Sequence, residues 1–158
     1  MHVINIPSAV ELTQVEEGPS EYLNYKKPSI TERLGLVTSR VGQGAYRKSI
    51  IHRWEYKCAV TDFNKLEVLI ASHIVPWSGA TSDERLDVHN GILLSPHFDA
   101  LFDKHLISFD QKGKILLHDS IEMTAFNKIG IRGDEQIRKL SEYNQVYLER
   151  HRYQFGLT

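Results

Sequence analysis

Three polar positions between residues 71 and 103 have residue types and spacing that suit a catalytic site. His73 stands at the end of an apolar run, just before a loop that opens with Pro76. An unperturbed histidine has a pKa of about 6.5, so this one could act as a general base near neutrality. Asn90 precedes the next apolar run, where its amide can orient a loop and a neighbouring histidine by hydrogen bonds.

The third position holds two candidate metal ligands, His97 and Asp99, in the first turns of an expected helix. An imidazole or a carboxylate there can bind a borderline or hard cation. In a regular helix the two side chains point about 200° apart, on opposite flanks of the apolar face. Both therefore reach one metal only if the helix begins after His97, and the choice between them stays open on geometry alone.

Each of these residues also has a simpler interpretation. A single histidine at a strand end is commonly structural, Asn-Gly is commonly a turn, and helical aspartates are commonly solvated. The order of the three positions along the chain is what favours a site.

The elements that must position these residues follow from the hydrophobic periodicity. The pattern predicts strands at 58–61, 67–74 and 91–94, a loop at 76–89, and a helix from Pro96 with Ser95 as its N-cap. Helices are expected at 29–41 and 45–56, separated at Gly42 and Gly44, and again at 134–152. A hairpin is expected at 106–117. The fold class is therefore α+β.

Length and composition indicate one globular domain. The chain has 158 residues, of which 41% are hydrophobic and 25% charged, with a net charge of −1. Cys58 is its only cysteine, which excludes a disulfide-rich scaffold or a four-cysteine zinc site. No apolar run approaches the length of a membrane span and no signal peptide is evident, so we expect a cytoplasmic protein without a membrane partner.

Charge is unevenly distributed along the chain. Residues 40–57 carry a net charge of +4, and residues 61–110 a net charge of −5. A basic segment beside an acidic one suits a site that holds a divalent cation and meets a polyanion, although two solvated faces of opposite charge would give the same pattern.

The separated motifs together resemble the HNH endonucleases of the ββα-metal fold, in the branch found in restriction-type proteins. The matching segments are Cys-Ala-Val-Thr at 58–61, Ala-Ser-His-Ile-Val-Pro-Trp at 71–77 and Asn-Gly-Ile-Leu-Leu-Ser-Pro-His-Phe-Asp-Ala-Leu-Phe-Asp at 90–103. The resemblance extends over about residues 36–155. It implies an HNH domain at 36–158, with a ββα-metal core, flanking helices and a small hairpin, preceded by an arm at 1–35.

The resemblance implies roles for these residues. His73 matches the general base and Asn90 the central asparagine. Asp99 stands nine residues after Asn90, where the family's last histidine stands, whereas His97 has the usual side chain two residues early. Ser72 replaces a family metal ligand. We therefore expect Asp99 as the main ligand and His97 as the second candidate, with Mg²⁺ or Mn²⁺ as the cation.

The expected reaction is hydrolysis of DNA phosphodiester bonds, with duplex DNA as the substrate. Expected phosphate contacts are Arg40, Arg47, Lys48, Arg53 and Arg85, although these could equally be surface charge. A homodimer is left open. Two alternatives also remain: a catalytically degenerate HNH module that only binds DNA, and an accessory or toxin-like nuclease directed by a partner.

Overall fold

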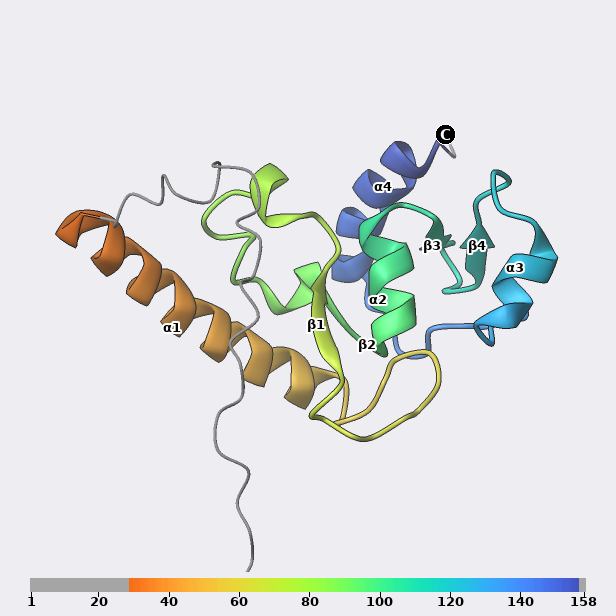
Figure 1. Cartoon of the computed structure of the whole chain (residues 1–158), viewed down its shortest axis with the longest axis horizontal. Coiled ribbons are helices and arrows are strands. Elements are labelled where there is room, and N and C mark those ends of the chain that lie inside the picture. The colour runs from red at the N-terminus through yellow and green to blue at the C-terminus, as the bar shows by residue number, and fades with distance from the viewer. Residues whose placement is uncertain (1–28, 157–158) are drawn as a thin grey trace, which may run out of the picture. The chain divides into compact units, whose positions relative to one another are not determined.

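The computed structural model describes residues 29–156; within the first helix, the side chains of residues 31–41 are outside this description (Figure 1). Contacts divide the chain into two compact units, Met1–Gly35 and Leu36–Thr158. The helices are α1 (Ile30–Arg53), α2 (Pro96–Asp103), α3 (Met123–Lys128) and α4 (Glu142–Phe155), with short 3₁₀ turns η2 (Trp77–Gly79) and η3 (Val88–Asn90). The strands are β1 (Ile70–His73), β2 (Gly91–Leu94), β3 (Ile107–Phe109) and β4 (Ile115–Leu117).

Strands β1 and β2 form an antiparallel pair that carries the candidate base at one end. Ile70 pairs with Leu94, and His73 pairs with Gly91. All four residues of β2 are buried, which agrees with its uninterrupted apolar sequence. The register places His73 beside the start of β2, directly after Asn90.

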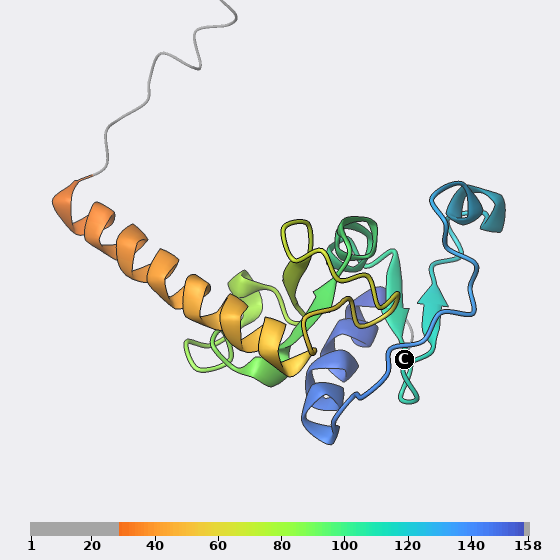
Figure 2. The same cartoon turned by 90° about the horizontal axis from the view of Figure 1, so that it is seen from below.

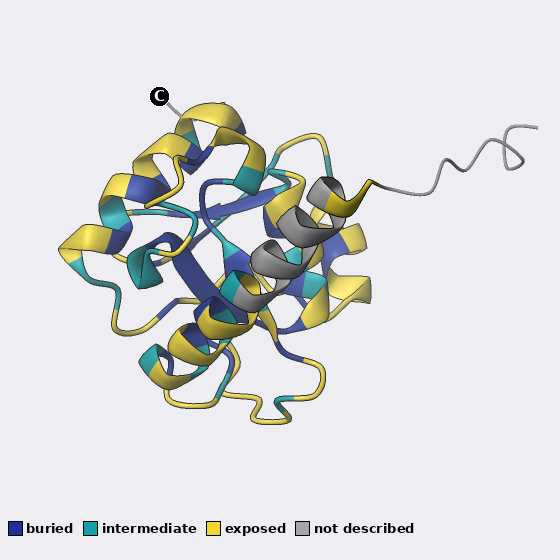
Figure 3. Ribbon diagram, turned by 90° about the vertical axis from the view of Figure 1, so that its left-hand side faces the viewer, coloured by how far each residue is buried: buried dark blue, intermediate teal, exposed yellow. Residues whose placement is uncertain are grey.

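Helix α2 packs against β1 and completes a strand–strand–helix unit. It begins at Pro96, as predicted, and buries Phe98 and Phe102. Figure 3 shows the buried residues on the strands and on the inward sides of the helices. The α+β class and the strand–strand–helix order expected for the core are therefore confirmed.

The second strand pair, β3 with β4, is the predicted hairpin. Ile107 pairs with Leu117, and Gly113 in the connecting turn has a φ of 79°, which glycine adopts without strain. Helix α4 packs along β3, and Figure 2 shows α3 beyond the hairpin.

Several predicted elements were wrong. Helix α1 runs through Gly42 and Gly44 without a break, because two glycines cost a helix only about 1 kcal/mol each and packing outweighs that. The predicted strand at 58–61 is a turn, held by hydrogen bonds from Ala59 N to Leu93 O and from Ser95 N to Cys58 Sγ. Strand β1 is only four residues long, half of the expected length.

The last helix also begins later than predicted. It starts at Glu142, where Ser141 and Asn144 form a reciprocal capping box. The preceding residues are extended, with Gln136 bridged to Lys114, and helix α3 was not predicted. Tyr143 and Val146 have helical spacing with buried residues of α4, yet they are 67% and 61% exposed. No helix within residues 29–156 is long and apolar enough to span a membrane.

Candidate active site

The imidazole of His73 is half-buried at the end of β1, and a backbone carbonyl holds it. Its Nε2 lies 2.9 Å from the carbonyl oxygen of Arg85, in the loop between β1 and β2. A carbonyl only accepts hydrogen bonds, so Nε2 carries the proton in this contact and Nδ1 of the neutral ring keeps its lone pair. Nδ1 makes no hydrogen bond to the described residues. The ring is therefore set to accept a proton at Nδ1.

The surroundings of His73 keep its imidazole neutral. Burial lowers the pKa of His73, and the hydrogen bond with the Arg85 carbonyl opposes that effect only in part. The ring stacks on Tyr46 of α1, and the edge of Trp77 meets it at a centroid distance of 5.9 Å. A neutral imidazole near pH 7 is the form that a general base requires.

Tyr46 is a site residue that the sequence analysis did not find. Its hydroxyl donates to the carbonyl oxygen of Asn90 at 2.8 Å, and the ring is 4% exposed. Burial raises the pKa of Tyr46, so the phenol stays protonated. Helical spacing showed Tyr46 as one of several apolar positions of α1, and nothing in that spacing distinguished it from the core residues beside it.

Asn90 fixes the loop that follows His73. Its Oδ1 accepts from Val75 N at 2.8 Å, and its Nδ2 donates to Glu84 O at 3.0 Å and to Val75 O at 3.3 Å. The side chain is fully buried and all of these partners are backbone groups. Asn90 therefore acts through the conformation of the loop, and its amide has no spare group to offer a metal.

Asp99 on α2 lies against β1. Its carboxyl group is hydrogen-bonded to the side chain of Ser72, the residue before His73. Burial and then the nearby carboxylate of Asp103 raise the pKa of Asp99, while the Ser72 hydrogen bond lowers it. An incoming cation would relieve both of the effects that raise the pKa.

His97 lies on the other flank of α2. Its ring contacts Phe98 at a centroid distance of 4.4 Å and lines a shallow hollow with Thr61, Phe63 and Val68. Burial lowers the pKa of His97, and Glu135 opposes this. Helix α2 is regular from Pro96, so the structure does not bring His97 and Asp99 to one point.

The donor chemistry around Asp99 fits a hard cation. Within residues 29–156, no group of three or more His, Cys, Asp or Glu side chains is arranged to hold a metal. Magnesium is commonly held by only one or two carboxylates, with water and substrate phosphate oxygens completing its coordination. Asp99, with the hydroxyl of Ser72 beside it, matches that pattern.

The basic residues expected at the DNA have different environments. Arg47 donates to the carbonyls of Leu66 and Leu69, and Arg53 donates to Lys139 O. Arg85 donates to Trp77 O and lies over the Trp77 ring. Lys48 is exposed. The side chain of Arg40 is outside the described residues.

Residues 58–110 match the family model described as HNH endonuclease. This segment covers one third of the chain, and contains β1, β2, α2 and the residues His73, Asn90, His97 and Asp99. Within residues 58–110 the match agrees with the HNH resemblance predicted from the sequence. The branch found in restriction-type proteins stays a prediction. No curated protein matches the chain. Tyr46 and α4 lie outside the matched segment.

Proposed function

We propose that the chain is a metal-dependent endonuclease that hydrolyses DNA phosphodiester bonds, with His73 as its general base. The observation that carries this proposal is the contact between His73 Nε2 and the Arg85 carbonyl, which leaves Nδ1 as the acceptor. General-base assistance of this kind typically accelerates a reaction by about 10² to 10⁴-fold. The match of residues 58–110 to the HNH endonuclease family supports the same reaction class.

In the proposed mechanism, His73 Nδ1 takes a proton from the water that attacks the phosphorus. Asn90 holds the loop that carries the Arg85 carbonyl, and Tyr46 supports the face of the imidazole. Asp99 would hold Mg²⁺ or Mn²⁺, with His97 as the weaker candidate. When bound, the cation neutralises charge on the scissile phosphate and on the departing 3′ oxygen. The expected products carry a 5′-phosphate and a 3′-hydroxyl.

Duplex DNA is the proposed substrate. Lys48 is exposed on α1 and is available to a phosphate, whereas Arg47, Arg53 and Arg85 already donate to backbone carbonyls. An arginine has five N–H donors, so these three keep some for phosphate oxygens. Arg40 completes the proposed set.

The test is cleavage of supercoiled plasmid with Mg²⁺ or Mn²⁺, with and without a chelator, by the wild type and His73→Ala. We expect chelation to stop cleavage and His73→Ala to lower the rate at least 100-fold, equivalent to about 3 kcal/mol of transition-state stabilisation. DNA binding by the variant, measured by fluorescence anisotropy, should stay within threefold. A cleavage rate within tenfold of the wild type would remove His73 from the mechanism.

A second candidate function is a DNA-binding module without hydrolytic activity. The absence of a cluster of three His, Cys, Asp or Glu side chains within residues 29–156 favours it. This candidate predicts DNA binding that a chelator does not weaken, and no nicking with either metal. A nuclease directed by a partner would instead nick DNA slowly alone and faster with that partner.

A further inference from the structure

One face of helix α4 contacts the loop between β1 and β2 at several points. Asn144 Nδ2 donates to His89 O at 2.7 Å, and the Tyr147 hydroxyl donates to Asp87 Oδ2 at 2.6 Å. Arg150 Nη1 donates to Glu84 Oε1 at 2.6 Å and its Nη2 to Gly79 O at 3.1 Å. The three donors are spaced three residues apart, so they share one face of α4. We call Asn144, Tyr147 and Arg150 the loop clamp.

The contacts of the loop clamp enclose the carbonyl that holds the candidate base. Arg85 lies between Glu84 and Asp87, the two loop carboxylates that the clamp binds. Glu84 is bound twice, since its carbonyl also accepts from Asn90 Nδ2. The direction of the Arg85 carbonyl therefore depends on two neighbours that are fixed to α4, about 60 residues further along the chain.

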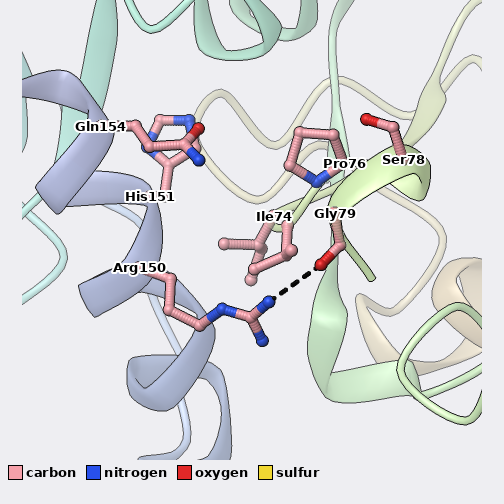
Figure 4. A pocket seen from close by; sticks show the side chains of 8 residues that line it. Ile74, Pro76, Ser78, Gly79, Arg150, His151 and Gln154 are labelled. Atoms are coloured by element: carbon pink, nitrogen blue, oxygen red, sulfur yellow. Dashed lines mark hydrogen bonds between the residues drawn. The ribbon is translucent and has the colours of Figure 1, made fainter. Parts of the chain in front are cut away.

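The first part of the loop, residues 74–79, does not pack closely against α4. Figure 4 shows a cavity between α4 and the segment after His73, with Arg150, His151 and Gln154 on one side and the Ile74–Gly79 segment on the other. Its volume is about 150 Å³, and the Arg150–Gly79 hydrogen bond crosses it. Side chains beside an unfilled space lack contact partners on one side. Hydrogen bonds within the loop, such as Arg85 N to Thr81 O and Asp87 N to Glu84 O, shape the Arg85 segment. The loop clamp ties that segment to α4.

We propose that Tyr147 and Arg150 are positioning residues for His73: they fix the loop so that the Arg85 carbonyl selects the tautomer with the proton on Nε2. This inference rests on the proposed function, in which Nδ1 of His73 is the base. Neither residue contacts the imidazole. Without the contacts of Tyr147 and Arg150, the Arg85 carbonyl can turn away from His73. The imidazole then populates both tautomers, and only a fraction of the protein molecules has a basic Nδ1.

The variants that test this are Tyr147→Phe, which removes only the hydroxyl, and Arg150→Gln. Arg152→Gln is the matched control, because Arg152 is also an arginine of α4 but donates to Phe109 O on β3 rather than to the loop. The full chain is labelled with ¹⁵N in its histidine rings, and His73→Gln assigns the His73 signals. Tautomers are read from the ring-nitrogen shifts, and kcat and KM from plasmid nicking.

We expect the wild type and Arg152→Gln to show His73 with its proton on Nε2. In Tyr147→Phe and Arg150→Gln, the two nitrogen shifts should move toward each other, and kcat should fall about tenfold while KM stays within twofold. Lower melting temperatures with unchanged His73 shifts would overturn the inference, because they indicate only a structural role. If the wild type does not cut DNA, the proposed function fails, and the ring-nitrogen shifts still decide whether the loop clamp sets the tautomer. If Arg150→Gln does not fold, Tyr147→Phe alone tests the inference.

Discussion

The phenol ring of Tyr46 lies parallel to the imidazole of His73, with the ring centroids 4.1 Å apart and the planes inclined by 7°. The close fit of Tyr46 depends on Gly91, the strand partner of His73. A Cβ at Gly91 would lie 2.2 Å from Tyr46 Oη and 2.4 Å from Ile50 Cδ1. The absence of a side chain at residue 91 is therefore what allows Tyr46 to stack on His73.

Replacing Gly91 with alanine should destabilise the protein and displace Tyr46. We expect Gly91→Ala to lower the free energy of unfolding by about 2 kcal/mol, because a buried side chain must shift. Urea unfolding measures this, and the same change made in Tyr46→Phe should cost less because the closest clashing atom is gone. If Gly91→Ala lowers the free energy of unfolding of the otherwise wild-type protein by less than about 0.5 kcal/mol, Tyr46 does not pack closely against Gly91.

Removing Asp99 should abolish metal-dependent cleavage, whereas removing His97 should weaken it less. Asp99 faces β1 beside Ser72, and His97 lines the hollow on the other flank of α2. We expect Asp99→Ala to lose Mn²⁺ binding in calorimetry together with nicking, and His97→Ala to lose about 10- to 100-fold in nicking. Asp119→Asn, at an exposed carboxylate outside α2, is the control. Normal Mn²⁺ binding by Asp99→Ala with none by His97→Ala would identify the imidazole as the ligand instead.

Replacing Asn90 with aspartate should destabilise the fold more than most isosteric changes. The variant keeps an acceptor for Val75 N but loses the donors to Glu84 O and Val75 O, and it places a buried carboxylate against both carbonyls. A cost of about 3 kcal/mol is expected in urea unfolding at pH 7.5. Asn64→Asp, at an exposed loop position, should change the stability by less than about 0.5 kcal/mol. Similar losses for the two variants would rule out this role for the Asn90 amide.

Stability should fall on acidification because of His151. This histidine is buried between Ser108 Oγ and Phe102 O, each 2.9 Å from a ring nitrogen, and burial lowers its pKa to about 4. An unfolded histidine titrates near 6.5, so between about pH 6.5 and 4 the unfolded chain binds the extra proton. The stabilisation from the buried, neutral His151 is therefore fully present above pH 6.5. It declines as the pH falls toward 4.

The loss attributable to His151 between pH 7.5 and pH 5 should be on the order of 2 kcal/mol. Urea unfolding at the two pH values measures the loss in the wild type and in His151→Gln, which has no proton to gain. The difference between the two losses isolates His151 from His73, His97 and Asp99, whose pKa values are also shifted. Equal losses in the two proteins would refute the assignment.

Local signals in the sequence were enough to predict the central elements. The uninterrupted apolar run of β2 and the Ser95-Pro96 start of α2 each determine their element within a few residues, and both predictions were correct. The predictions failed where contacts between residues far apart in the sequence determine the structure. Gly42 and Gly44 lie inside a helix, and Tyr143 is exposed although it has helical spacing with buried neighbours. Periodicity identifies a face but not whether another element covers it.

In the candidate site, too, only the residues that lie in a local motif could be predicted from the sequence. His73, Asn90 and Asp99 could be picked out because they lie in a compact motif, although their proposed roles remain predictions. Tyr46 and Tyr147 could not, because their contacts with Asn90 and Asp87 span 44 and 60 residues of the sequence. No local pattern encodes a contact of that separation, and both residues are of a type that commonly fills a core.

These long separations also bear on when a newly made chain gains a working site. A ribosome releases the chain from its N-terminus, and domains with many distant contacts fold slowly. When residues up to Asp103 have emerged, the β1–β2–α2 unit is present but Tyr147 and Arg150 are not yet made. The contacts of the loop clamp therefore form only after α4 has emerged, whereas those of Asn90 and Tyr46 can form earlier. Under the proposed mechanism, full hydrolytic activity would therefore require that α4 has been synthesised.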